Sequence, residues 1–188
     1  MSYSFNRAGK RRRGYSISQV DEFLKIAREQ YNNPSLSLVS AMDVRATRFE
    51  LERNGYSISV VDAALEKLED AFAAAEFGKE LKNQGYFEFT EDLAEVKKLV
   101  LARCNRKNKK KFRKRKWPNK GYSTRQVDAF CSQLGNKVET KANLTVKELR
   151  VATFKLKRGG YAEYQVDAFL EKVVEGLQRE QALSKVSR

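Results

Sequence analysis

Apolar residues recur at helical spacing at several places along this 188-residue chain. The spacing i, i+3, i+4, i+7 is typical of a helix with one buried face. The clearest stripes are Val20, Phe23, Leu24 and Ala27; Val61, Leu65, Leu68 and Phe72; and Val166, Phe169, Leu170 and Val173. A further helix is predicted over about residues 90–104, and only residues 86–89 alternate like a short extended piece. The pattern predicts an all-α fold.

Local signals predict where the helices begin and end. Ser16 with Gln19, and Ser123 with Gln126, match the capping box, in which each side chain bonds the other residue's backbone. The same spacing predicts short helices that begin at Ser40 and Thr145. Glycine favours helix ends, so we expect the helix that starts near residue 57 to stop at residue 78. For the same reason, the helix that begins near Ser123 should break at residue 135.

One motif occurs four times, and glycine, tyrosine, valine and aspartate keep their spacing in every copy. Its positions are Gly14, Tyr15, Val20 and Asp21; Gly55, Tyr56, Val61 and Asp62; Gly121, Tyr122, Val127 and Asp128; and Gly160, Tyr161, Val166 and Asp167. The tyrosines are separated by 41, 66 and 39 residues, so the copies form two pairs. A repeat of this length indicates stacked supersecondary units.

The repeats predict tandem short helical modules, arranged as two duplicated pairs with a helical and basic connector. The first pair covers residues 1–77, as modules 1–34 and 38–77. The connector covers 78–111, and the second pair covers 112–182, as modules 112–136 and 144–180. We expect the repeated tyrosine, valine and phenylalanine side chains in the core. Each repeated aspartate should favour its helix dipole or bond a neighbouring turn.

Positive charge is concentrated in one part of the sequence. The net charge is +14, yet residues 1–76 are neutral overall, and residues 103–120 hold eleven Lys or Arg and no acid. Such a run is either a solvated linker or an arm for a polyanion, nucleic acid or anionic lipid. The predicted anionic-surface residues are Arg11, Arg12, Arg13, Lys109, Lys110, Lys111, Arg113, Lys114, Arg115, Lys116, Trp117 and Lys120.

The composition argues against catalysis. The chain has no histidine, and its two cysteines, Cys104 and Cys131, lack the spacing of a zinc site. No phosphate-binding or nucleophile motif occurs. We therefore expect no enzymatic activity, cofactor, metal or small-molecule substrate. No apolar run is long enough to span a bilayer, and no secretory signal is apparent, so we expect a cytoplasmic protein.

The repeated motif resembles the N-terminal domain of the DivIVA family of bacterial cell-division and polar-growth scaffolds, which includes GpsB. The fourth copy is closest, with Leu144, Thr145, Leu149, Arg150 and Phe154 upstream of its Gly-Tyr pair. The resemblance implies a short helical module that dimerises ahead of a long coiled coil. It also implies recruitment of division or wall-synthesis proteins and contact with anionic membrane at the inner face of the cell membrane.

Two departures from the family shape the functional hypotheses. The family's membrane tip carries an aromatic residue and arginine just before the Gly-Tyr pair, whereas this chain has residues 12–13, 53–54, 119–120 and 158–159 there, none aromatic. No heptad run follows any module, so we expect tandem modules to replace the dimer. The first hypothesis is a division-associated scaffold that binds protein partners and anionic membrane. The second is a nucleic-acid-binding protein that uses the basic arm.

Overall fold

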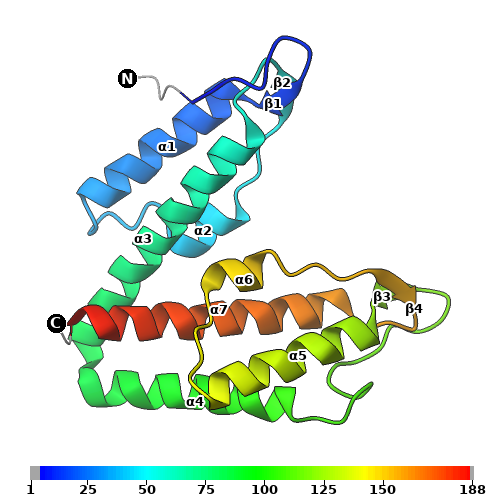
Figure 1. The fold of residues 1–188 in the computed structure, drawn as a ribbon. Coiled ribbons are helices and arrows are strands. Elements are labelled where there is room, and N and C mark those ends of the chain that lie inside the picture. The colour runs from blue at the N-terminus through cyan, green and yellow to red at the C-terminus, as the bar shows by residue number, and fades with distance from the viewer. Residues whose placement is uncertain (1–4, 187–188) are drawn as a thin grey trace. The chain divides into compact units, whose positions relative to one another are not determined.

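The computed structural model describes residues 5–186, which contain seven helices and two small antiparallel sheets (Figure 1). The predicted all-α character holds for most of this range, and the two sheets are additional features. The chain forms two compact units, residues 1–79 and residues 80–188. We call them unit 1 and unit 2 and describe each by itself.

The elements follow one another in the same order in the two units, apart from one helix. Unit 1 contains β1 (Arg13–Tyr15), α1 (Ile17–Asn32), α2 (Ala41–Ala46), β2 (Leu51–Arg53) and most of α3 (Ile58–Gln84). Unit 2 contains the end of α3, then α4 (Tyr86–Cys104), β3 (Lys120–Tyr122), α5 (Thr124–Glu139), α6 (Val146–Arg150), β4 (Leu156–Arg158) and α7 (Glu163–Val186). Helix α4 has no counterpart in unit 1.

The two Gly-Tyr segments of unit 1 cross at very close range. The amide of Tyr15 donates to the carbonyl of Tyr56 at 3.0 Å, and the amide of Tyr56 donates back at 2.9 Å. A Cβ on Gly14 would lie 2.1 Å from the Tyr56 carbonyl oxygen, and a Cβ on Gly55 would lie 2.4 Å from that of Tyr15. The glycines are therefore required because two backbones touch here.

Unit 2 has the same crossing. Tyr122 and Tyr161 exchange backbone hydrogen bonds of 2.9 and 2.8 Å. Added Cβ atoms on Gly121 and Gly160 would lie within 2.3 Å of backbone oxygens of the opposite segment. In both units the crossing continues as a three-residue strand pair, β1 with β2 and β3 with β4. The strands are too short to give a period-two signal in the sequence.

The tyrosine hydroxyls add hydrogen bonds to the repeated aspartates. Tyr56 donates to Asp21 at 3.0 Å, and Tyr161 donates to Asp128 at 2.7 Å. In the opposite direction, burial together with hydrogen bonding to Asp62 raises the pKa of Tyr15. These aspartates therefore bond the tyrosine of the opposite Gly-Tyr segment. The sequence left open a helix-dipole role or a bond to a neighbouring turn, and the observed bond is nearer to the second.

Aromatic rings pack around each crossing. Phe5 meets Tyr56 edge-on at 5.3 Å, and Phe112 meets Tyr161 in the same way at 5.4 Å. The predicted helical stripes supply the rest of the core, with Val20, Val61, Val127 and Val166 all at most 1% exposed. The expectation that the repeated residues form the core is confirmed for these valines and for Tyr56 and Tyr161, which are fully buried.

The two predicted short helices are present. Ser40 and Asp43 form a complete capping box at the start of α2, and this hydrogen bonding lowers the pKa of Asp43. At α6 the Thr145 side chain accepts from the Glu148 amide. These local signals succeed because all the groups involved lie within four residues of one another.

The capping boxes expected at Ser16 and Ser123 are wrong. Neither serine side chain caps its helix. Gln19 instead accepts a hydrogen bond from the Glu50 amide at 2.8 Å, and Gln126 accepts one from the Lys155 amide at 2.8 Å. Each glutamine is drawn away from its own helix because it satisfies an amide of the segment that leads into the second strand.

The predicted helix ends at glycine are also wrong. Helix α3 passes through Gly78 and ends at Gln84, and α5 passes through Gly135 and ends at Glu139. A Cβ on Gly135 would lie 3.1 Å from the Cys104 Cβ, so this glycine permits close approach of α5 and α4. Residues 86–89 form the first turn of α4 rather than an extended piece, and Gly85 with φ of 88° precedes it.

The crossing predicts opposite effects for two glycine substitutions in unit 1. Gly14→Ala forces a Cβ against the Tyr56 carbonyl and should lower the free energy of unfolding by about 3 kcal/mol. Gly78→Ala is the matched control because nothing lies within 4 Å of its added Cβ. It should raise stability by about 0.5–1 kcal/mol, since alanine is the better helix former. Urea unfolding measures both, and equal effects would contradict the close crossing.

A second prediction concerns alkaline pH. Burial and the hydrogen bond to Asp128 raise the pKa of Tyr161 in the folded state. Its contribution is therefore complete below the unfolded pKa of about 10 and is lost as pH rises above that value, by about 1.4 kcal/mol per pH unit. Tyr161→Phe should cost about 1–3 kcal/mol at neutral pH.

The variant should also lose stability less steeply than the parent protein above pH 10. Urea midpoints measured between pH 8 and 11 give the comparison. Tyr164→Phe is the control, because this tyrosine is 59% exposed. Identical alkaline slopes for Tyr161→Phe and the parent would contradict the assigned role of Tyr161.

Candidate anion-binding surface

The basic segment between α4 and β3 is fixed along its backbone. The Lys109 amide donates to Asp128 at 2.7 Å, and the Arg113 amide donates to the Gln165 side chain at 2.8 Å. The Arg115 amide donates to the Gly160 carbonyl at 2.8 Å. Backbone groups are thus bonded inward to unit 2, while the side chains of Lys109, Lys110 and residues 113–116 are exposed. The backbone of this segment is therefore held by unit 2, whereas a solvated linker was one of the two alternatives that the sequence left open.

Lys111 does not belong to the anion-binding surface, which corrects the prediction made from the sequence. Its side chain is 2% exposed. Its ammonium group donates to the carbonyl oxygens of Cys104 and Arg106, the latter at 2.7 Å, and its amide donates to the Tyr161 hydroxyl at 3.1 Å. Helix α4 ends at Cys104 with carbonyls that lack helical partners, and a lysine beside them satisfies those carbonyls and their partial negative charge.

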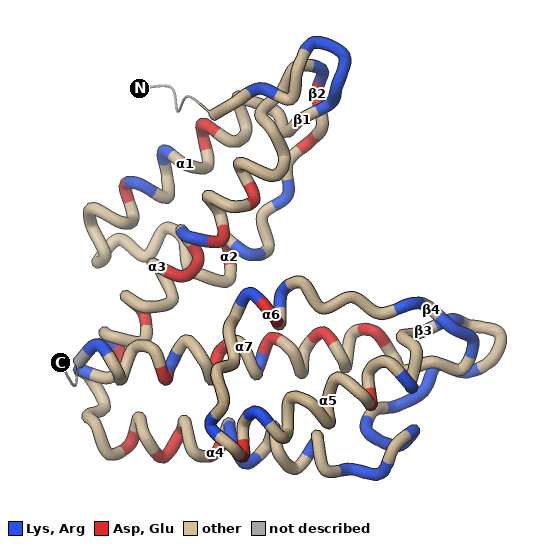
Figure 2. Tube along the Cα trace, viewed as in Figure 1, with Lys and Arg blue, Asp and Glu red and all other residues tan. Residues whose placement is uncertain are grey.

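Strand pairing brings further cations to this segment. Lys120 on β3 lies opposite Arg158 on β4, with Lys157 opposite Gly121. Figure 2 shows Lys and Arg gathered around β3, β4 and the loop before them. We call this set of exposed residues the unit 2 basic tip, and it consists of Arg113, Lys114, Arg115, Lys116, Lys120, Lys155, Lys157 and Arg158.

A shallow depression of about 370 Å³ lies beside the unit 2 basic tip. Its lining includes Arg125, Lys155 and Lys157, together with the hydroxyl-bearing Ser123. Three cations around one concave surface favour an oxyanion, because arginine and lysine donate charge-assisted hydrogen bonds to phosphate or carboxylate oxygens.

Unit 1 has a smaller version of the same arrangement. Arg13 on β1 lies opposite Arg53 on β2, and the Asn54 amide donates to the Arg12 carbonyl at 3.1 Å. The exposed residues Lys10, Arg11, Arg12, Arg13 and Arg53 form what we call the unit 1 basic tip. Arg7 stacks its guanidinium over the Tyr56 ring at 5.5 Å and donates to the Asn54 carbonyl. It therefore connects the Tyr56 ring to the backbone that follows Arg53.

Like charges face each other across both sheets. Such direct cross-strand pairs destabilise a two-stranded ladder. Lys120 with Arg158 and Arg13 with Arg53 both show this conflict at strand ends. A local feature that disfavours folding and recurs at equivalent places is typical of a functional surface. An anion between the two side chains would remove the repulsion.

The single tryptophan stands out from the segment. Trp117 is 77% exposed, the highest exposure among the exposed large apolar residues of the described chain. It follows residues 113–116 directly and precedes β3 by three positions. An exposed aromatic ring beside clustered cations has the composition of a lipid-interface anchor or of a stacking site for a nucleobase.

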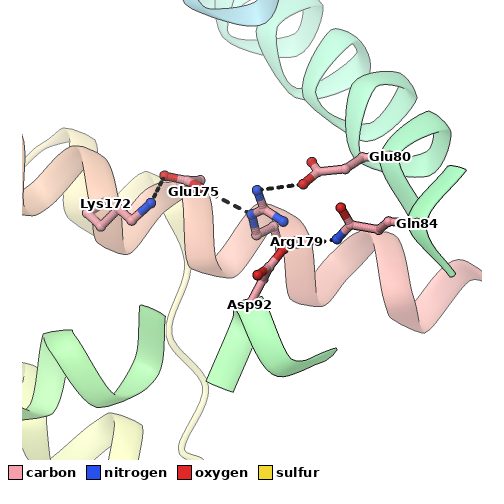
Figure 3. Close-up of polar contacts among 6 residues, drawn as sticks. All are labelled: Glu80, Gln84, Asp92, Lys172, Glu175 and Arg179. Atoms are coloured by element: carbon pink, nitrogen blue, oxygen red, sulfur yellow. Dashed lines mark hydrogen bonds and ion pairs between the residues drawn. The ribbon is translucent and has the colours of Figure 1, made fainter. Parts of the chain in front are cut away.

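Another charged cluster of unit 2 is formed by side chains of opposite charge that contact one another. Arg179 on α7 contacts Glu80 at 3.0 Å and Glu175 at 3.2 Å (Figure 3). Its guanidinium also lies 5.2 Å from the centre of the Phe89 ring. Gln84 donates to Asp92 at 3.0 Å close by. This cluster joins the end of α3 to α4 and α7, and it serves packing rather than recognition.

The described residues contain no group of three or more metal-ligating side chains. None of their helices is long and apolar enough to cross a bilayer. Comparison with family models, curated proteins and solved structures gives no match for this chain.

Sequence reasoning found part of this surface. It identified Arg11–Arg13, residues 113–116 and Lys120, and the structure places them at the two tips. It did not assign Arg53, Lys157 and Arg158 to the surface, because strand pairing across more than 35 residues brings them there. It also missed Lys155, which lies next to β4 and accepts a hydrogen bond from the Ser123 amide. The available signal was that Arg53 and Arg158 occupy the same place before their Gly-Tyr pairs.

The facing cations predict that one substitution improves stability and impairs binding. Arg158→Glu places a carboxylate opposite Lys120 and should raise the free energy of unfolding by about 0.2–1 kcal/mol. The same change removes two units of positive charge from the unit 2 basic tip and should weaken binding to anionic vesicles. Calorimetry and vesicle sedimentation test the pair of effects. A destabilised variant that binds normally would contradict this description.

Proposed function

We propose that this protein is a non-enzymatic, DivIVA-like scaffold or adaptor. It binds protein partners of the division or cell-wall machinery and attaches through its basic tips to the anionic inner face of the cytoplasmic membrane. The observation that carries the proposal is the recurrence of like-charged strand pairs beside a Gly-Tyr crossing in both units.

The proposal includes a duplication of paired modules. Equivalent contacts support it: Tyr56 with Asp21 in unit 1 corresponds to Tyr161 with Asp128 in unit 2. The order strand, helix, short helix, strand, long helix also occurs in each unit. Within a unit the first module pairs with the second, so one chain supplies the contacts for which the related family uses two chains.

Attachment to anionic lipid is mainly electrostatic in this proposal. Each Lys or Arg near an anionic surface contributes about 1 kcal/mol. The eight residues of the unit 2 basic tip are exposed and come from three neighbouring segments, so they offer a two-dimensional positive surface. Trp117 adds an amphipathic ring that suits the headgroup region.

The second candidate is binding to nucleic acid. Exposure of Trp117 beside four consecutive cations favours it, because a base can stack on the ring while lysine and arginine neutralise phosphates. Half of those cations are lysines, which supply charge more than base-edge specificity. This candidate therefore predicts binding that depends little on nucleotide sequence.

One flotation experiment separates the two. The full chain is floated with vesicles of phosphatidylglycerol and phosphatidylcholine, and with phosphatidylcholine alone, each with and without excess duplex DNA at physiological salt. Trp117 is the only tryptophan, so a blue shift of its emission reports the same binding. The scaffold proposal expects flotation only with anionic vesicles, and flotation that survives DNA. Abolition by DNA would favour the second candidate.

Charge-matched variants localise the effect. Replacement of Arg113, Lys114, Arg115 and Lys116 by glutamine removes about 4 kcal/mol of attraction, which corresponds to roughly a thousandfold weaker partitioning. The control variant carries glutamine at Lys25, Arg28, Lys67 and Lys98, all exposed on helices. It loses the same charge and should float much more than the tip variant. Equal loss in both variants would contradict a localised binding surface.

A further inference from the structure

Unit 2 contains a pocket away from its basic tip. The pocket has a volume of about 270 Å³ and lies among α4, the end of α5, the segment that follows α5, and α7. Its floor is aliphatic, with Val96, Val100 and Val173 buried and Leu144 and Leu177 half-buried. An apolar hollow of 150 Å³ can hold benzene, so this one has room for a larger apolar side chain.

Charge surrounds the apolar floor. The rim carries Lys97, Lys137 and Lys141, with Glu180 as its acid. Lys97 contacts Glu180 at 3.0 Å, and Lys137 contacts Glu148 of α6 at 2.7 Å. Lys141 is exposed and forms no ion pair with any residue that the structure describes. An apolar centre within a charged rim is the anatomy of a protein-binding surface, and this rim is positive.

The corresponding place in unit 1 has different chemistry. A pocket of about 400 Å³ lies between the end of α1, the segment before α2, and α3. By the spacing of the repeats, Gln30, Tyr31 and Pro34 occupy the positions of Lys137, Val138 and Lys141. Its charged lining residues are Asp43, Glu76 and Lys79, so acids outnumber bases there. The positive rim is therefore a property of unit 2 alone.

We propose that the unit 2 pocket binds an acidic peptide segment of a partner protein, with a bulky apolar side chain in the pocket and flanking carboxylates on the lysine rim. This inference rests on the proposed scaffold function and names the chemistry of its partner. Charge complementarity supplies the specificity. Lys97 and Lys137 already contact Glu180 and Glu148, so the excess positive charge of the rim lies at Lys141, which attracts an acidic segment and repels a basic one.

The pocket dimensions favour a peptide over a small cofactor. Sites for small ligands usually enclose about 300–1,000 Å³, and this pocket is below that range. Its rim lysines come from α4, α5 and the following segment, so they are spread around the opening. Separate carboxylates along a chain reach such a rim more readily than a single carboxylate of a compact molecule does.

The pocket and the unit 2 basic tip lie at opposite ends of α5. The tip adjoins Thr124 at the start of that helix, and the pocket adjoins Lys137 near its end. Thirteen residues of helix span about 20 Å. Partner and membrane therefore contact different surfaces of unit 2, and each function has its own variants.

Fluorescence anisotropy tests the proposal on the full chain. The probe is a fluorescein-labelled peptide with the sequence Gly-Ser-Glu-Glu-Phe-Leu-Glu-Glu-Gly-Ser. Saturable binding is expected, with no binding of peptides that carry serine in place of Phe-Leu or lysine in place of glutamate. Lys141→Glu should weaken binding about fivefold or more. Ala142→Phe, which fills the opening from an exposed position, should weaken it as well.

Lys98→Glu is the matched control, because it makes the same charge change on exposed α4 surface outside the pocket. It should bind the probe almost as tightly as the parent does. Thermal melts of each variant check that it folds. Absence of probe binding, or equal binding by Lys141→Glu and the parent, would overturn the proposal. Vesicle flotation of the same variants stays normal if the pocket alone is misassigned, so the two proposals fail separately.

Discussion

The backbone crossing at the Gly-Tyr pairs is the constraint on which the structure depends. In each unit two tyrosines, 41 or 39 residues apart, exchange amide and carbonyl hydrogen bonds at a separation that leaves no room for a Cβ on the preceding glycines. The crossing fixes where the helices that follow the Gly-Tyr pairs begin, which are α1 and α3 in unit 1 and α5 and α7 in unit 2. Bonds between tyrosine hydroxyls and aspartates then join each of these helices to the tyrosine of the opposite segment. Because the tyrosine amides and carbonyls at the crossing bond the opposite segment, neither Gly-Tyr segment satisfies these polar groups alone.

The sequence predicted the parts of this design that are local or repeated. The valine stripes, the short helices at Ser40 and Thr145 and the core role of Tyr56 and Tyr161 all follow from spacing within a few residues. The strands escaped prediction because three residues give too little pattern and their partners are distant. The same distance explains Gln19, whose side chain bonds an amide 31 residues away instead of its own helix. Residue type also misled, since Gly135 suited a helix end and yet lies inside α5 against Cys104.

Burial divides the basic segment into structural and surface roles. Lys111 turns inward to the end of α4, whereas Lys109, Lys110 and residues 113–116 are exposed. A count of charges treats these lysines alike, and only the path of the backbone distinguishes them. The facing cations at the strand ends show the opposite case, in which charge remains exposed at a cost to the sheet. The buried lysine stabilises the fold, and the exposed cations provide the surface on which the proposed function depends.

The repetition of the crossing raises a question of partner choice within the chain. The first Gly-Tyr segment meets the second, yet the fourth offers nearly the same groups, and Tyr15 lies 41 residues from Tyr56 and 146 from Tyr161. Loop-closure entropy favours the nearer partner by only about 1 kcal/mol. One feature of unit 2 has no counterpart among the described residues of unit 1: helix α4, which packs on α5 and α7. Because α4 packs on the two helices that follow Tyr122 and Tyr161, an exchange of Gly-Tyr partners, within one chain or between chains, would also disrupt this packing.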